Sequence, residues 1–290
     1  MNLIRVWLLA ILTAGWGQAR SAEAEARVAI IIDDIGYNRI LSERAARLPG
    51  AFTLSVLPFT PHGLTTALLA HDQGKELMLH APMSNINNLP LGPGGLYSHT
   101  NKDLFIATLR KDLNSLPFIK GVNNHMGSRL TQEIEPMNWV MEELQARGVY
   151  FVDSRTSAQT KAFEVAHEYH VPSLKRDVFL DDVQDTKAIT QQLSRAIKIA
   201  RQQGSAIAIG HPYPTTLAVL ENIQPLLLQQ QVSLVFASQL LPIQDLPLTK
   251  TANVSNNCAV IMIMLCFNAP PKTELVLTNY MIQFNFLGIK

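Results

Sequence analysis

Short apolar runs alternate with helix-like segments along most of the chain, and this alternation limits the possible folds more than any other feature. The apolar runs predict strands at residues 28–32, 52–57, 76–80, 119–128, 149–153, 171–180, 206–210 and 232–237. Segments with helical spacing lie between them, and the last spans residues 214–230. Such alternation is typical of parallel sheets, so we expect an α/β protein with roughly eight parallel strands closed into a barrel.

The first apolar run ends in two adjacent carboxylates, Asp33 and Asp34, before Gly36 lets the chain turn. A β-branched run of this kind predicts a strand that is buried on both faces. Successive strand residues point to opposite sides, so both carboxylates can face one direction only if the strand ends between them. A lone Asp here would equally well cap a helix, but two neighbouring acids repel each other and need a cation or a donor nearby. The pair therefore favours a functional site.

Side chains that can bind metals follow several other predicted strands. Besides the two acids, the strand ends carry His80, His125, Asp153 and His211. The carboxyl ends of all strands in a barrel share one mouth, so we expect these side chains to converge there. One such histidine is more often a hydrogen-bonded structural residue, but three beside two acids indicate a site.

Three imidazoles and two carboxylates suit one divalent metal ion, and zinc is the expected ion. The chain has only two cysteines, Cys258 and Cys266, both late in the sequence, so neither a disulfide framework nor a cysteine-rich metal site is expected. Three protein ligands would leave one coordination position open, which is typical of catalytic zinc. A spare carboxylate and a spare imidazole can then serve as general base and general acid.

Six motifs in a fixed order point to a known family. They are IIDDIGY at 31–37, LMLHAPM at 77–83, GVNNHMGS at 121–128, YFVDS at 150–154, KRDVFLDD at 175–182 and AIGHP at 208–212. Together they resemble the divergent polysaccharide deacetylase family over about residues 26–241. This resemblance implies a distorted (β/α) barrel of about seven to eight parallel strands. It also implies metal-dependent hydrolysis of N-acetyl or O-acetyl groups on glycans.

The resemblance also implies roles for individual residues. Asp33 would be the general base, Asp34 and His80 metal ligands, and His211 the general acid. Typical members carry a second histidine four residues after the first, where this chain has Ser84. His125, at the position of the family's Arg-Pro-Gly motif, would replace it as the third ligand.

That replacement removes the arginine that normally steadies the base in this family. Arg176 or Arg129 would have to take its place. Asp153, Asp181 and Asp182 are all candidates to orient His211, and the sequence does not rank them.

The two ends of the chain differ from its middle. A basic Arg5, the apolar run at 6–14 and small residues at 17–19 or 22–24 predict a signal peptide over residues 1–24, and therefore a periplasmic or secreted protein. The barrel domain is expected over residues 26–245. The tail at 246–290 contains an apolar run at 258–267, too short to span a bilayer, and its structure is not predicted. No stable transmembrane span is expected in the mature form.

The predicted signal peptide and the family resemblance together imply an exported, metal-dependent hydrolase that removes acetyl groups from a cell-envelope glycan or oligosaccharide. Charged residues make up 16% of the chain and the net charge is +1, without a Lys/Arg cluster, so a nucleic-acid partner is not expected. Two alternatives remain: a non-catalytic glycan- or peptidoglycan-binding protein on the same barrel, and a hydrolase of another amide or ester. Asp33 beside Asp34, together with His211, favours catalysis, whereas the altered ligand set favours a binder or a new substrate.

Overall fold

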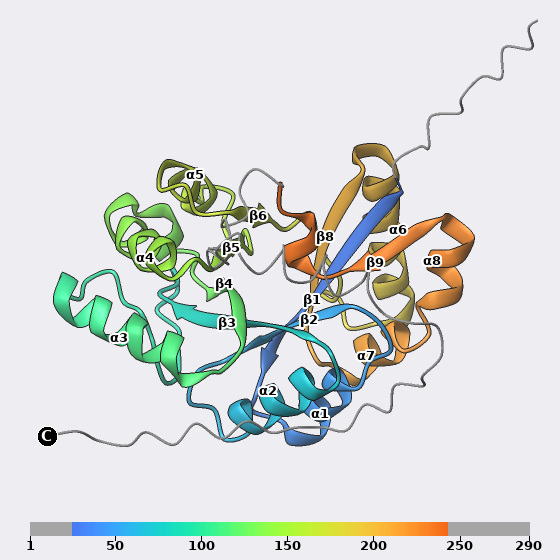
Figure 1. The fold of residues 1–290 in the computed structure, drawn as a ribbon, viewed down its shortest axis with the longest axis horizontal. Helices are drawn as coiled ribbons and strands as arrows, with labels where there is room; N and C mark the ends of the chain where they lie inside the picture. Colours follow the sequence, from blue (N-terminus) through green and yellow to red (C-terminus); the bar gives the residue numbers. More distant parts are fainter. Residues whose placement is uncertain (1–24, 243–290) are drawn as a thin grey trace, which may run out of the picture. The chain divides into compact units, whose positions relative to one another are not determined.

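The computed structural model describes residues 25–242, and their strands form one parallel sheet curved into an incompletely closed barrel (Figure 1). The strand order is β6-β5-β4-β3-β2-β1-β8-β7, and β9 pairs with β1 beside that path. The strands are β1 (Ala26–Ile35), β2 (Phe52–Val56), β3 (Glu76–Met83), β4 (Ile119–Met126), β5 (Tyr150–Asp153), β6 (Ser173–Lys175), β7 (Val178–Phe179), β8 (Ser205–Gly210) and β9 (Val232–Val235). This topology confirms the predicted α/β fold, a distorted (β/α) barrel. The predicted signal peptide at 1–24 and the predicted tail at 246–290 lie outside the described residues.

The predicted strand at 171–180 consists of two short strands on opposite edges of the sheet. β6 pairs with β5, whereas β7 pairs with β8. Between them, the Arg176 N–H donates to the Asp153 carbonyl at 3.0 Å, and the Asp177 N–H donates to the Ile207 carbonyl at 2.9 Å. Consecutive residues therefore bond to opposite edges. The barrel is distorted because residues 176 and 177, rather than a full strand, connect the two edges of the sheet.

The helices lie around the outside of the strands (Figure 1). They are α1 (Arg39–Ala46), α2 (Gly63–Asp72), α3 (Lys102–Ser115), α4 (Ile134–Arg147), α5 (Ala162–Glu168), α6 (Thr186–Gln203), α7 (Pro214–Leu220) and α8 (Gln224–Gln230). The prediction of one helix over 214–230 is wrong, because α7 and α8 are separate. Pro225 lies in the first turn of α8, where its ring fits a helix start and disfavours a helix running through the preceding residue. None of the helices within residues 25–242 is long and apolar enough to cross a bilayer.

The alternation of side chains along β1 divides the core into two layers. Val28, Ile30 and Ile32 belong to the layer between sheet and helices, whereas Ala29 and Ile31 belong to the layer inside the barrel. All five are fully buried, as expected for a central parallel strand. Every second residue of a strand therefore points into the barrel, and we call these positions the inner parity. A polar residue can reach the mouth of the barrel only from such a position, unless the strand is locally irregular.

The amino end of the barrel is filled by its own side chains. The buried Glu76 carboxylate accepts hydrogen bonds from the Thr53 hydroxyl at 3.0 Å and the Tyr150 hydroxyl at 2.8 Å. It also accepts from the backbone N–H and the hydroxyl of Ser238, in the short 3₁₀ helix Ala237–Leu240. The amino end is therefore occupied by structural side chains, and a ligand site is expected at the carboxyl end of the strands.

A buried carboxylate on α3 predicts how stability depends on pH. Both oxygens of Asp112 are buried without a hydrogen-bond partner, and burial raises the pKa of Asp112 to about 8. Its ionisation therefore costs no stability below about pH 4, and the cost grows as the pH rises towards 8. We expect Asp112→Asn to raise the melting temperature at pH 8 and above but not at pH 4. Thermal unfolding across pH checks this, with the exposed Asp103→Asn on the same helix as control; an equal shift at both pH values would contradict it.

Candidate active site

The end of β1 brings two adjacent carboxylates to the same side of the sheet. Asp33 shares the parity of Ala29 and Ile31, so it points into the barrel. By simple alternation Asp34 would point away, but the register of β1 against β2 shifts between Ile32 and Ile35. Asp34 has a φ of +57°, a left-handed conformation that Asp adopts more readily than most residues. The strand therefore does not end between the two acids; a local irregularity turns both towards the mouth.

Three side chains from three strands converge at the mouth. Asp34 Oδ1 lies 3.2 Å from His80 Nε2 and 2.9 Å from His125 Nδ1. The two ring nitrogens are 3.2 Å apart. The structure thus brings together the three residues that the sequence suggested as metal ligands.

The geometry and chemistry of this trio fit a divalent metal ion. Ligands bound to a tetrahedral zinc at about 2.1 Å lie about 3.4 Å from one another, close to the separations observed here. Asp34 Oδ1 is buried and has no partner with hydrogen-bond geometry, although both imidazoles surround it. One carboxylate and two imidazoles are a donor set suited to zinc. Asp34, His80 and His125 could therefore hold the ion.

Asn123 connects one candidate ligand to the neighbouring acid. His80 Nδ1 lies 2.7 Å from Asn123 Oδ1, which also accepts the Ser55 hydroxyl at 2.6 Å. Since an amide oxygen only accepts, Nδ1 carries the proton and Nε2 is left free to bind a metal. The Asn123 amide nitrogen donates to Asp33 Oδ1 at 2.8 Å. Asn123 and Ser55 are both fully buried, so this network is shielded from water.

Asn123 and Ser55 were not predicted from the sequence, although the sequence contains a signal for Asn123. Asn123 lies two residues before His125 on the same strand, so both point to the same face. Ser55 faces the same interior from β2, because its neighbours Leu54 and Val56 belong to the outer layer.

The two carboxylates have opposite pKa shifts. Burial raises the pKa of Asp33, and its contacts with His80, His211 and Asn123 offset this only in part. Burial also acts to raise the pKa of Asp34, but contacts with His125 and His80 outweigh it and lower that pKa. Asp34 is therefore the carboxylate that stays ionised, as a ligand must, while Asp33 is the one able to hold a proton.

His211 follows β8 and is held by Asp181. Asp181 Oδ1 is 2.9 Å from His211 Nδ1, and Oδ2 accepts the backbone N–H of His211 at 2.6 Å. The Thr216 hydroxyl donates to the same Oδ2 at 2.8 Å. The Nε2 of His211 points towards the acids, 3.9 Å from Asp34 Oδ2. Burial would lower the pKa of His211, but the Asp181 carboxylate and the acids at the mouth raise it to about 9.

The other candidate orienting acids lie elsewhere. Asp153 has the parity of the outer layer, so its carboxylate accepts from the Arg155 N–H at 2.8 Å and the Thr160 hydroxyl at 3.0 Å. Asp182 is exposed. Of the three acids, Asp181 alone has a hydrogen bond to His211 within the part of the chain that the structure describes.

Neither arginine considered for steadying Asp33 contacts it among the described residues. Arg176 donates to the carbonyls of Ser154 and Arg155, and its guanidinium lies over the Phe179 ring. The Arg129 guanidinium donates to the carbonyls of Asn85 at 3.4 Å and Ile86 at 3.3 Å, in the loop after β3. The steadying contact of Asp33 comes from the neutral amide of Asn123 instead.

The contact between Asp181 and His211 predicts a measurable change in the pKa of His211 when Asp181 is replaced. We expect Asp181→Asn to lower the pKa of His211 well below about 9, because it removes the negative charge that stabilises the protonated ring. An NMR titration of the His211 ring in metal-free protein checks this. The exposed Asp182→Asn variant is the matched control, and an unchanged His211 titration in Asp181→Asn would contradict the assignment.

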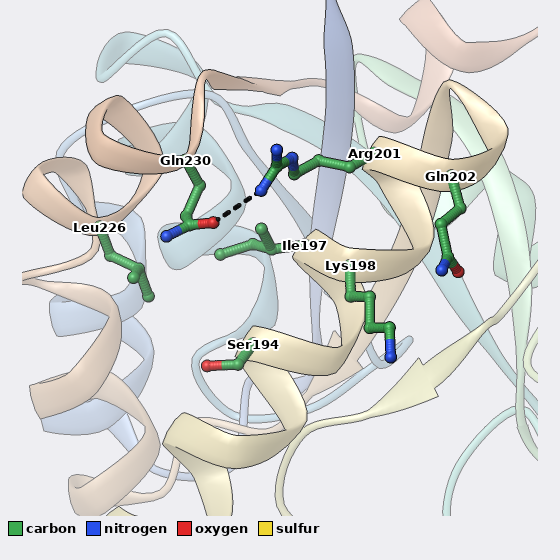
Figure 2. Close-up of a pocket in the computed structure, with 7 residues that line it drawn as sticks. All are labelled: Ser194, Ile197, Lys198, Arg201, Gln202, Leu226 and Gln230. Carbon is green, nitrogen blue, oxygen red and sulfur yellow. Dashed lines mark hydrogen bonds between the residues drawn. The ribbon is translucent and has the colours of Figure 1, made fainter.

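A hollow elsewhere on the molecule is lined by none of the residues of this site. It has a volume of about 540 Å³ and lies between α6 and α8, where Arg201 donates to Gln230 at 3.1 Å (Figure 2). Its walls come from the half of α6 that leads into β8, together with Leu226 of α8. None of the predicted site residues lines it, so we do not assign the chemistry there.

Comparisons with known proteins agree with the resemblance seen in the motifs. The model of the divergent polysaccharide deacetylase family matches residues 30–241, a stretch that contains the whole candidate site. The uncharacterized protein YibQ of Escherichia coli (strain K12) is 39% identical over 219 residues, covering 74% of this chain and 67% of that protein. An uncharacterized protein of Haemophilus influenzae is 36% identical over 200 residues, covering 68% of this chain and 71% of that protein. The crystal structure of the uncharacterized protein ATU2773 from Agrobacterium tumefaciens C58 gives a TM-score of 0.72 at 25% identity, covering 76% of this chain and 91% of that one.

Proposed function

The chain belongs to the divergent polysaccharide deacetylase family, and from this premise we propose that it is a metal-dependent hydrolase that removes acetyl groups from a glycan or oligosaccharide of the cell envelope. One observation carries the proposal. Asp34, His80 and His125 form a trio that could hold a metal ion, and a second carboxylate, Asp33, and His211 flank this trio. A binding protein would not need a carboxylate and an acid-type imidazole on either side of such a trio.

The ligands would be Asp34 Oδ1, His80 Nε2 and His125 Nδ1, and zinc is the proposed ion. An ion held there would polarise an acyl carbonyl and make a water molecule acidic enough to attack at neutral pH. Asn123 fixes the tautomer of His80 that exposes Nε2.

Asp33 is the proposed general base. Asp33 directly precedes Asp34 in the sequence, and its Oδ2 lies 3.7 Å from His80 Nε2. This oxygen can therefore reach a water molecule at the trio. Asn123 holds the other oxygen of Asp33. A raised pKa in a buried carboxylate makes it a better proton acceptor, and Asp33 would take the proton of the attacking water.

His211 is the proposed general acid. Asp181 holds Nδ1, so Nε2 faces the mouth and carries a proton at neutral pH. As water adds to the acetyl carbon and the C–N or C–O bond breaks, His211 would protonate the departing amine or alcohol. Acetate is the other product. The proton gained by Asp33 and the proton lost by His211 balance the reaction.

We propose that the reaction takes place outside the cytoplasm, in the periplasm or after secretion. Support comes from the sequence at 1–24, with its short apolar run and small residues, which would be removed before a domain at 26–245 acts. The substrate would be a polymer or oligosaccharide carrying N-acetyl or O-acetyl groups.

Acetate release tests this function against its alternatives. Zinc-loaded protein is incubated with N-acetylated and O-acetylated glycan fragments, and acetate is measured with and without a chelator. We expect chelator-sensitive release from at least one class. The altered ligand set, with Ser84 where typical members have a histidine, makes a non-catalytic binder the competing function. Fragments that bind the zinc-loaded protein without acetate release would favour that binder, and release from simple esters alone would favour another hydrolase.

A further inference from the structure

A second pocket lies beside the mouth, in a loop that the candidate site does not use. It has a volume of about 260 Å³ and is lined by the loop after β3 and by Arg129 after β4. The residues that matter here are Ser84, Asn85, Tyr97, His99 and Arg129. None of them takes part in the proposed reaction.

Backbone hydrogen bonds fix the walls of this pocket. The Ser84 N–H donates to the Leu96 carbonyl at 3.0 Å, and the Leu96 N–H donates back to the Pro82 carbonyl at 2.8 Å. The Arg129 N–H donates to the Ser84 carbonyl at 3.0 Å, joining the loops after β3 and β4. The Asn85 side chain donates to and accepts from the backbone of Leu89. The pocket is therefore formed before any ligand enters, which lowers the entropic cost of binding.

The lining favours an anionic, partly apolar ligand. Arg129 has no carboxylate partner among the described residues, and no acidic residue lines the pocket. The ring centroids of Tyr97 and His99, which both line the pocket, lie 5.5 Å apart and offer an aromatic surface. Ser84 is 7% exposed, and its hydroxyl has no hydrogen-bond partner among the described residues. A guanidinium that donates to backbone carbonyls but has no carboxylate partner can still pair with the carboxylate of a ligand, and aromatic rings in a pocket can pack against a sugar ring.

The position of the pocket relates it to the metal-ligand trio. Ser84 lies four residues after His80 and Arg129 four residues after His125, and the two strands pair up to Met83 and Met126. At about 3.3 Å per residue along β3, Ser84 lies roughly 13 Å from His80, one of the trio. A ligand with one group at the trio and another in the pocket would be an oligosaccharide rather than a single sugar.

We propose that this pocket binds a carboxylate-bearing sugar unit of the substrate, with Arg129 pairing with the carboxylate and Tyr97 packing against the sugar ring. The proposal rests on the proposed function for its glycan substrate. It adds that the glycan is acidic, with the carboxylate on a unit near the acetylated one.

Binding of two matched monosaccharides tests the proposal. Methyl β-D-glucuronide and methyl β-D-glucoside differ only in the carboxylate, and each is titrated into ¹⁵N-labelled protein while the amides of residues 84–99 are followed by NMR. We expect the glucuronide to shift these amides and to bind about tenfold or more tighter than the glucoside, a difference of about 1.4 kcal/mol. Arg129→Met should remove this preference, and Arg129→Lys should retain part of it. The exposed Arg147→Met, on α4, is the matched control and should bind as wild type.

The same titration on His80→Ala separates this proposal from the proposed function. Binding of the glucuronide should be unchanged there, because the pocket does not use the trio. Equal affinity for both sugars, wild-type binding in a folded Arg129→Met variant, or amide shifts away from residues 84–99 would each overturn the proposal. Tight glucuronide binding without acetate release would support the proposed pocket and contradict only the proposed hydrolase function.

Discussion

Asp33→Asn and His211→Gln should each lower the rate of acetate release by about 10²- to 10⁴-fold, the usual cost of losing a positioned base or acid. Asn cannot accept the proton of the attacking water, and Gln cannot donate one to the leaving group. Asn at position 33 can still accept the hydrogen bond from Asn123, and Gln at position 211 is a neutral amide of similar size. Rates are measured with zinc-loaded protein on the substrate that gives acetate release.

These two variants should keep their metal and their fold. Asp33 has a raised pKa, so its ionised form is disfavoured in the folded protein and a neutral Asn costs little stability. Melting temperature and zinc content are measured beside the rates, with the exposed Asp182→Asn as a control for a nearby loss of charge. Wild-type rates in either variant would rule out its role. Rates that fall only in proportion to folded protein would mean that the residue is structural.

Removal of any one of Asp34, His80 or His125 should reduce bound zinc from about one ion per chain to a small fraction. Each residue supplies one of three converging ligand atoms, and two remaining ligands hold zinc far more weakly. Metal content of Asp34→Ala, His80→Ala and His125→Ala is measured after dialysis against a fixed zinc concentration. This readout does not depend on activity.

His167→Ala is the matched control for the ligand variants, because His167 is exposed on α5 and belongs to no predicted site. Its zinc content should equal that of wild type. Full zinc occupancy in the three ligand variants, or the absence of zinc from correctly folded wild type, would contradict the trio. Loss of zinc in His125→Ala would also distinguish this site from one in which Ser84 replaces the missing histidine as a ligand.

Much of the fold followed from the periodicity of the sequence. Eight apolar runs, each bounded by turn residues, were sufficient to predict parallel strands and a common mouth. The same runs placed Asp33, His80, His125 and His211 towards the carboxyl ends of strands. The prediction that the strand beginning at residue 76 ends at His80 is wrong, because β3 pairs with β4 as far as Met83. Periodicity could not reveal that residues 171–180 form two strands on opposite edges, since pairing partners depend on the whole sheet.

The order of the strands along the chain and the residue types near their carboxyl ends could be predicted from the sequence. Which of these side chains face one another depends on the tertiary packing. The parity of β5 turns Asp153 towards the helices, so that Asp181 is the acid that holds His211. A left-handed Asp34 brings the second carboxylate inward, and Asn123 takes the place expected for an arginine. The physical reason is that a side chain's direction depends on backbone irregularities and strand pairing, which are set by packing across the barrel rather than by local sequence.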